Sequence, residues 1–251
     1  MTRVPREISP TGAYHIMVRG INKQEILMSS DEKTEYLQRL FFLKQEYLIL
    51  LCAYAIMDNH AHFLLIEQGD EAALAKLMLR LNSGYASWYN HRHGRIGTLF
   101  QERYCSEVIH NDSQLLTVVR YIHQNPVKIG RSVSYWTSYN DYLNDSGITD
   151  TELVLSMFSP EQAIARKRFS EFVEEENELQ VSFDEQKRLR NTDKKIIDIA
   201  ESIVGKGKVR SLIYLDTENR NEQLKRLKKS GLTVRQIEKT TGISKSVVSR
   251  A

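Results

Sequence analysis

Residues 48–66 read LILLCAYAIMDNHAHFLLI, and this stretch decides the fold. Its first ten residues, 48–57, are almost wholly apolar, which predicts a strand buried near the centre of a sheet. Asp58 and Asn59 are turn-forming residues, and residues 61–66 resume an extended, apolar pattern. We therefore expect two strands paired as a tight hairpin, with His60 and His62 at their junction.

The segments on either side of this hairpin alternate between strand-like and helix-like patterns. Residues 14–22 and 103–110 predict strands, and a helix capped by Ser30 and Asp31 is expected to run to about Tyr47. An apolar stripe predicts a second helix over about 71–90. A third helix, capped by residues 111–113, should end near Asn125 because Pro126 disfavours helical geometry before it. The order βαββαβα predicts an α+β, ferredoxin-like domain: an antiparallel sheet with helices mainly on one face.

Charge divides the chain into three regions. Residues 140–186 hold 3 Lys+Arg against 12 Asp+Glu, whereas residues 187–251 hold 17 against 7. We predict a domain over 1–138, an acidic helical connector over 139–186 and a basic all-helical region over 187–251. The basic region indicates either a polyanion partner or solvated helix faces, and charge alone leaves both open.

The remaining composition excludes several classes of protein. Cys52 and Cys105 are the two cysteines, too few for a disulfide framework or a thiolate metal site. The N-terminus lacks the apolar core of a signal peptide, and no apolar run reaches the roughly 18 residues of a membrane helix. We expect a soluble, cytoplasmic protein without a membrane partner.

His60 and His62 are two residues apart on a predicted strand, so their side chains project from one face and can converge on a divalent ion. Taken alone, such a pair is more often a surface or hydrogen-bonded pair. On the third helix, Tyr121 and Asn125 lie four residues apart beside the apolar stripe, and His123 points to the opposite flank. Asn125 could complete a metal site beside the phenol; the alternative is a packing tyrosine and a capping asparagine.

Four stretches resemble motifs of the HUH single-tyrosine transposases. Residues 58–65, DNHAHFLL, resemble the family's His-hydrophobic-His strand, and residues 120–127, RYIHQNPV, resemble its nucleophile helix. Residues 14–20 and 97–104 resemble its first strand and the segment before its fourth strand, so the likeness covers residues 12–130. Asn-Pro after the tyrosine is closer to the REP-associated tyrosine transposases than to insertion-sequence transposases.

This resemblance implies a domain that cuts single-stranded DNA near hairpins. It implies Tyr121 as the nucleophile, His60, His62 and Asn125 as ligands of Mg²⁺ or Mn²⁺, and a 5′-phosphotyrosine intermediate that a 3′-hydroxyl can reverse without ATP. Phosphate contacts are harder to assign, because any basic residue near such a site looks the same in a sequence. The candidates in this domain are Arg19, Arg103 and Arg120.

The basic region carries a second pattern. Residues 233–236 fit a capping box that opens a helix to about Thr241, Gly242 makes a turn, and Ser244 caps a further helix, within which the sequence ends. The pattern resembles a helix-turn-helix that binds duplex DNA, with a small basic packing bundle as the alternative. The residues expected to face the major groove are Lys245, Ser246, Ser249 and Arg250.

Three functions follow from these observations. The leading one is a metal-dependent single-stranded DNA endonuclease and strand transferase, with a homodimer left open. The second is a domesticated, sequence-specific DNA-binding protein that regulates repeats or genes without cutting. The third is a replication initiator or relaxase, which we favour least because those proteins usually carry a different motif order and larger helicase or primase partners.

Overall fold

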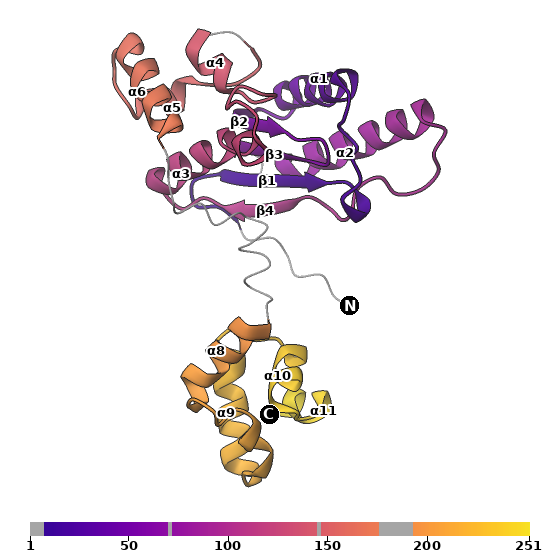
Figure 1. Cartoon of the computed structure of the whole chain (residues 1–251), viewed down its shortest axis with the longest axis vertical. Coiled ribbons are helices and arrows are strands. Elements are labelled where there is room, and N and C mark those ends of the chain that lie inside the picture. Colours follow the sequence, from indigo (N-terminus) through magenta and orange to yellow (C-terminus); the bar gives the residue numbers. More distant parts are fainter. Residues whose placement is uncertain (1–7, 70–71, 145–146, 176–192) are drawn as a thin grey trace. The chain divides into compact units, whose positions relative to one another are not determined.

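The computed structural model describes residues 8–69, 72–144, 147–175 and 193–251. Contacts between residues divide the chain into two compact units, residues 1–176 and 177–251, whose elements are labelled in Figure 1. No helix in the described ranges combines the length and the apolarity that crossing a membrane requires.

Unit 1 is built on a four-stranded antiparallel sheet. Its strands are β1 (Ala13–Arg19), β2 (Ile49–Ile56), β3 (His60–Glu67) and β4 (Cys105–Val108), in the spatial order β2-β3-β1-β4. Two strands are shorter than predicted. β1 ends three residues early because a 3-10 turn, η1 (Ile21–Lys23), follows it with two residues in the left-handed region. β4 begins at residue 105 instead of 103.

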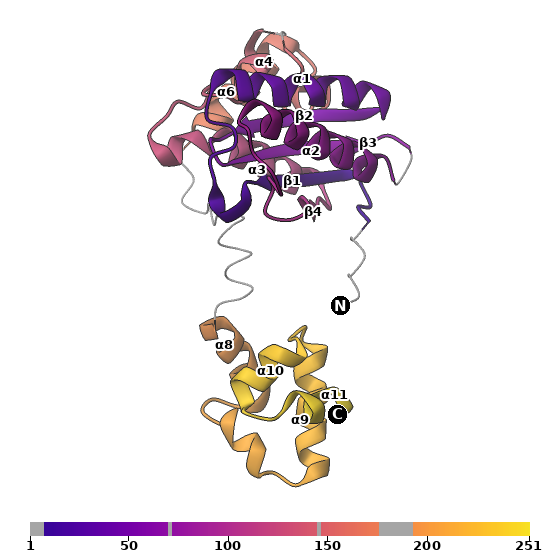
Figure 2. The ribbon, with the colours of Figure 1, turned by 90° about the vertical axis from the view of Figure 1, so that its right-hand side faces the viewer.

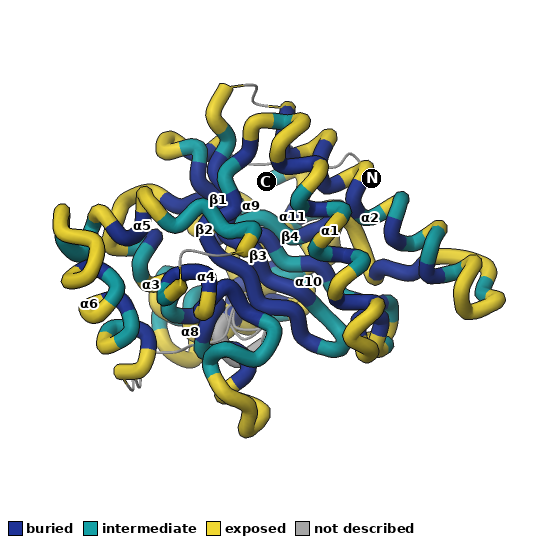
Figure 3. The backbone as a smooth tube through the Cα atoms, turned by 90° about the horizontal axis from the view of Figure 1, so that it is seen from above, coloured by how far each residue is buried: buried dark blue, intermediate teal, exposed yellow. Residues whose placement is uncertain are grey.

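Three helices complete the predicted order βαββαβα, which is confirmed. Figure 2 shows α1 (Ser30–Glu46) and α2 (Ala73–Arg92) side by side over one face of the sheet. The helix α3 (Asp112–His123) packs against β2 and β3. The view from above in Figure 3 shows the largely buried strands between α3 and the α1–α2 pair. The expectation that the helices lie mainly on one face therefore holds for α1 and α2 and is wrong for α3.

Alternation along the strands assigns one set of side chains to each face of the sheet. Ile16, Val18, Phe63 and Leu65 are buried in the core cluster that also contains the inner faces of α1 and α2. Because successive side chains of a strand point to opposite faces, residues 15, 17, 60, 62 and 64 must face α3. The parity of the strands thus places both histidines of the hairpin on the face that α3 covers.

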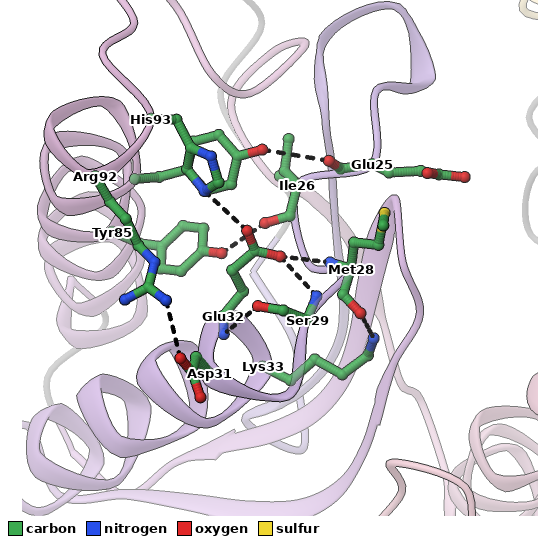
Figure 4. Close-up of polar contacts among 11 residues, drawn as sticks. Glu25, Ile26, Met28, Ser29, Asp31, Glu32, Lys33, Tyr85, Arg92 and His93 are labelled. Atoms are coloured by element: carbon green, nitrogen blue, oxygen red, sulfur yellow. Dashed lines mark hydrogen bonds and ion pairs between the residues drawn. The ribbon is translucent and has the colours of Figure 1, made fainter.

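The caps differ from the prediction at α1. Ser29 is the N-cap and accepts from the backbone N–H of Glu32, whose carboxylate accepts in turn from the backbone N–H groups of Ser29 and Met28 (Figure 4). The predicted caps, Ser30 and Asp31, instead occupy the first turn, where the aspartate carboxylate favourably faces the positive end of the helix dipole.

α3 is capped by Asn111, as predicted, but it ends at His123. The chain then enters a second 3-10 turn, η2 (Pro126–Ile129). Pro126 cannot donate a backbone hydrogen bond and its ring restricts the residue before it, so the helix stops earlier than residue 125.

The stretch predicted as an acidic connector contains three helices in its described part. They are α4 (Tyr139–Asn144), α5 (Glu152–Ser156) and α6 (Gln162–Glu174). α6 packs against α3 and α4, and the ring of Phe169 stacks on that of Tyr142 at 4.0 Å. Contacts therefore group these helices with unit 1, whereas the predicted boundary at residue 138 separates them from it. Glu176, predicted to continue the last helix, lies outside the described residues.

The described part of unit 2 is helical throughout, as predicted. It contains α8 (Asp193–Val204), η3 (Arg210–Tyr214), α9 (Thr217–Lys229), α10 (Val234–Thr241) and α11 (Lys245–Arg250). η3 is a short 3-10 turn, and α9 begins at Thr217 because the carboxylate of Asp216 accepts from the N–H groups of Glu218 and Asn219.

Candidate active site

The two histidines of the hairpin lie together on the face of the sheet covered by α3. The ring centroids of His60 and His62 are 5.0 Å apart, as expected for side chains at i and i+2 of one strand. His62 is buried at 2% exposure, whereas His60, beside the β2–β3 turn, is partly accessible. The pair therefore offers one buried and one accessible imidazole.

Hydrogen bonds orient both rings. His60 donates from Nδ1 to Asn59 Oδ1 at 2.5 Å, which makes Nε2 the nitrogen that carries the lone pair. His62 Nδ1 lies 3.0 Å from His15 Nε2 on the neighbouring strand β1, and the two rings stack with centroids 5.1 Å apart. If His62 is the donor in this pair, its Nε2 likewise carries the lone pair that a metal ion needs.

Burial keeps the imidazoles of His15 and His62 neutral. Desolvation lowers the pKa of His15 to about 3. It also lowers the pKa of His62 well below its usual range, with smaller contributions from the charges of His60, His15, Lys128 and Arg19. A neutral imidazole is the form that binds metal ions, so the environment of His62 favours the ligating state at neutral pH.

Tyr121, the candidate nucleophile, lies on α3 with its ring next to those of His62 and His15. Leu115, Val118 and Ile122 bury the apolar stripe of this helix against the sheet, and Tyr121 on its flank is 6% exposed. The ring of Tyr121 meets that of His62 edge-on, with centroids 5.5 Å apart, and lies 5.7 Å from that of His15. The phenol ring is therefore a direct neighbour of the histidines.

Asn125 follows α3 instead of continuing it. Its side chain is buried, and Nδ2 donates to the backbone carbonyl of Tyr121 at 3.0 Å. That bond identifies Nδ2 and leaves the amide oxygen, Oδ1, as the atom with which Asn125 could ligate a metal.

His123 points to the opposite flank of α3, as predicted. Its Nδ1 donates to the carbonyl of Val119, and its Nε2 accepts from Ser138 Oγ at 2.8 Å. Ser138 Oγ accepts from the backbone N–H of Tyr54 on β2. This buried chain of hydrogen bonds ties α3 to β2, the strand that pairs with the histidine-bearing β3.

The turn that presents His60 is held by a buried lysine. Lys33 of α1 is 1% exposed and donates to Asp58 Oδ1 at 2.7 Å and to the carbonyl of Met28, the second contact being drawn in Figure 4. The backbone of the turn is held as well, since Leu27 N–H donates to the Asp58 carbonyl and Gly20 N–H to the Asn59 carbonyl. The position of His60 is therefore set by α1 and by the chain after β1.

The three predicted phosphate contacts have different surroundings. Arg19 is half-buried and pairs in register with His60, whereas Arg103 is exposed in the segment before β4. Arg120 lies against α6: its guanidinium is 3.7 Å from the ring centroid of Phe172 and 3.1 Å from the carboxylate of Glu175. Arg120 is thus engaged within unit 1.

Lys128 belongs to this site, and the sequence analysis missed it. Its Nζ lies 4.2 Å from the ring centroid of Tyr121. No helical spacing indicated it, because α3 ends at His123 and Lys128 lies in the 3-10 turn η2. The contact of His15 with His62 depends on the pairing of β1 with β3.

Within the described ranges, no three His, Cys, Asp or Glu side chains lie where they could hold a metal ion together. A metal site here would therefore have to combine His60 and His62 with a donor of another kind.

Residues 9–125 match the family model for IS200-like transposases. Over these residues, the chain is similar to IS200-like transposases. The resemblance to single-tyrosine transposases is thereby confirmed at the level of the family.

Two solved structures are similar to part of this chain. A REP-associated tyrosine transposase bound to a REP hairpin is 19% identical, with a TM-score of 0.45, over 60% of this chain and 94% of that one. A protein of Deinococcus radiodurans R1, assigned as a transposase, is 14% identical, with a TM-score of 0.33, over 52% and 99%. A search of the curated proteins finds no match.

The candidate contacts outside the transposase domain lie on the last helix pair. Thr233 and Gln236 form the predicted capping box of α10, and Gly242 ends that helix in the left-handed conformation. Ser244 is the N-cap of α11, although its hydroxyl contacts Ser246 Oγ and makes no capping hydrogen bond. The four residues predicted to face DNA are all exposed: Lys245, Ser246, Ser249 and Arg250.

Proposed function

We propose that the transposase domain cuts single-stranded DNA and transfers the strand, with Tyr121 as the nucleophile. The observation that carries this proposal is the contact of the Tyr121 ring with the His62 ring, 5.5 Å between centroids, beside His60. The candidate nucleophile and the two imidazoles are therefore near neighbours, and one phosphate could meet both Tyr121 and an ion held by the histidines.

The chemistry explains why this neighbourhood matters. A phenol with a pKa of about 10 attacks poorly at neutral pH, so the phosphate must be made more electrophilic. His60 and His62 would hold a divalent ion through Nε2, with Oδ1 of Asn125 as a third ligand. When bound there, Mg²⁺ or Mn²⁺ would withdraw charge from a nonbridging phosphate oxygen and stabilise the more negative transition state.

The covalent step conserves phosphodiester bonds. The Tyr121 oxygen loses its proton to water and bonds to phosphorus, while the bond from phosphorus to the 3′ oxygen breaks and that oxygen takes up a proton. The product is a 5′-phosphotyrosine and a free 3′-hydroxyl. Because the bond energy is retained, another 3′-hydroxyl can attack and complete the transfer without ATP. A hairpin-bearing strand is the substrate we propose, from the resemblance of residues 120–127 to the REP-associated transposases.

A labelled single strand tests this function. Purified full-length protein is mixed with Mn²⁺ and a pool of strands in which hairpins are flanked by randomised nucleotides. We expect a denaturation-resistant protein–DNA adduct that carries a 3′ label, together with a 5′-labelled fragment ending in a 3′-hydroxyl. Absence of the adduct with both Mn²⁺ and Mg²⁺ across the pool would argue against cleavage and for the regulatory alternative.

We further propose that His15 positions His62 for metal binding. His15 Nε2 is 3.0 Å from His62 Nδ1, so it can fix the ring and its tautomer. His15→Phe keeps a stacked ring but removes the acceptor, and we expect Mn²⁺ affinity to fall by about 10- to 100-fold. Calorimetric titration with Mn²⁺ measures this without catalysis, and the exposed His110→Phe serves as the control. Unchanged affinity in folded His15→Phe protein would contradict the positioning role.

Unit 2 supports a second DNA contact, through α10 and α11 acting as a helix-turn-helix. Exposed Lys245 and Arg250 on α11 would face duplex DNA. In the full chain, we expect Lys245→Ala with Arg250→Ala to weaken binding to a mixed pool of duplexes at least tenfold, since each removed phosphate contact reduces affinity and salt dependence. Lys206→Ala with Lys208→Ala, both exposed between α8 and η3, is the control matched for the loss of two charges. An equal loss of duplex affinity in both variants would show that the effect is general electrostatic attraction and not a contact made by α11.

A further inference from the structure

The turn after the nucleophile helix brings a cation back onto the nucleophile. Pro126 opens η2 and Gly130 ends it in the left-handed conformation at φ 74°. Asn125 Nδ2, bonded to the carbonyl of Tyr121, ties the start of this turn to the last turn of α3. The fold of the turn therefore directs Lys128 toward the face of α3 that carries Tyr121.

Burial differs between the two partners. Tyr121 is 6% exposed, whereas Lys128 is exposed and its Nζ lies 4.2 Å from the ring centroid of Tyr121. The ammonium group thus stands on the accessible side of a buried ring. DNA that approaches the phenol must pass close to this charge.

A second cation lies near the histidines. Arg19, half-buried at the end of β1, pairs in register with His60, whose ring lies 5.0 Å from that of His62. Two separate elements, η2 and β1, therefore each bring a cation next to a residue of the candidate site.

We propose that Lys128 binds a nonbridging oxygen of the phosphate that Tyr121 attacks, and that it keeps this contact in the phosphotyrosine product. The proposal rests on the function proposed above. Lys128 stays protonated throughout and transfers no proton; the bonds made and broken are those of Tyr121 and the 3′ oxygen. Its contribution is to neutralise the negative charge that builds up on phosphorus oxygens in the transition state.

If Lys128 only packs on the Tyr121 ring, its side-chain stem matters and its charge does not. The variants therefore change the charge while they keep a long, unbranched stem. Lys128→Met keeps an unbranched stem over the ring and removes the charge, while Lys128→Arg keeps the charge. Lys167→Met on α6 removes an exposed lysine elsewhere in unit 1 and is the matched control. Thermal unfolding of all three variants establishes that they are folded.

The experiment has two arms, both with full-length protein. In single-turnover adduct formation, we expect Lys128→Met to be about 100-fold slower than wild type and Lys128→Arg to stay within about tenfold. In EDTA, where cleavage is suppressed, the salt dependence of single-strand binding should decrease by about 0.7 in log–log slope for Lys128→Met, the value for one phosphate contact. Lys167→Met should change neither quantity.

An unchanged slope in Lys128→Met would overturn the proposal, even if the rate fell, because a slower rate without the loss of a phosphate contact would show that the charge acts indirectly. A Lys128→Arg variant as slow as Lys128→Met would also overturn it. The binding arm requires no cleavage, so it judges Lys128 even if Tyr121→Phe protein still forms an adduct and the proposed function fails.

Discussion

Replacing Tyr121 by phenylalanine is expected to abolish the covalent adduct, with a loss of at least about 10³-fold in rate. The change removes only the hydroxyl. The ring should keep its edge-on contacts with His62 and His15 and its place beneath Lys128, because those contacts involve the ring. The fold and DNA binding should therefore remain, and the loss should lie in the chemical step.

The measurement is the denaturation-resistant adduct with a 3′-labelled hairpin strand, together with DNA affinity in EDTA. Tyr89→Phe is a suitable control, because the Tyr89 hydroxyl contacts the Glu25 carbonyl at 3.4 Å on the α1–α2 face of the sheet. An adduct that persists in Tyr121→Phe would assign the nucleophile to another residue. Loss of both the adduct and DNA binding would show a structural defect instead.

Removal of the two histidines should have the second largest effect. We expect His60→Ala to reduce Mn²⁺ affinity and adduct formation at least about 100-fold, and the double variant with His62→Ala to lose both. His60 is the sharper probe, because it is partly accessible and its removal leaves a smaller cavity than that of buried His62.

Metal-dependent stabilisation provides a readout besides catalysis. A bound ion stabilises the folded state by RT ln(1 + [L]/Kd), about 2.7 kcal/mol when the ion is at 100 times Kd. Wild type should therefore unfold at a higher temperature with Mn²⁺ than with EDTA, and the histidine variants should not. His110→Ala, an exposed histidine outside the site, should behave as wild type. A full Mn²⁺ response in the double variant would refute these ligands.

Local patterns predicted the secondary structure well. The apolar run before His60 predicted β2, and the extended, apolar pattern after the turn predicted β3, because short apolar runs next to turn-forming residues are typical of buried strands. Boundaries were less certain: the prediction put the cap of α1 at Ser30 and Asp31, while Ser29 makes the capping hydrogen bonds. Several adjacent residues can cap a helix, and the choice depends on which hydroxyl meets the N–H groups.

The candidate site was predictable only in part. The spacing of His60 and His62 placed both on one face, and helical spacing placed Tyr121 beside the apolar stripe of its helix. His15 and Lys128 were not found as partners of these residues. The contact of His15 depends on strand register, and that of Lys128 on a 3-10 turn, and neither is a local property of the sequence.

The sequence by itself determined the order of strands and helices, the shared face of the two histidines and the flank of the helix that carries Tyr121, since each follows from the period of a strand or helix. Only the tertiary structure decided which face of the sheet those histidines take and that α3 covers it. It also decided that Arg120 contacts Phe172 of α6 and Glu175, which lie some fifty residues further along the chain. The physical reason is that pairing and packing join residues far apart in the chain, and their energies depend on geometry that no local pattern contains.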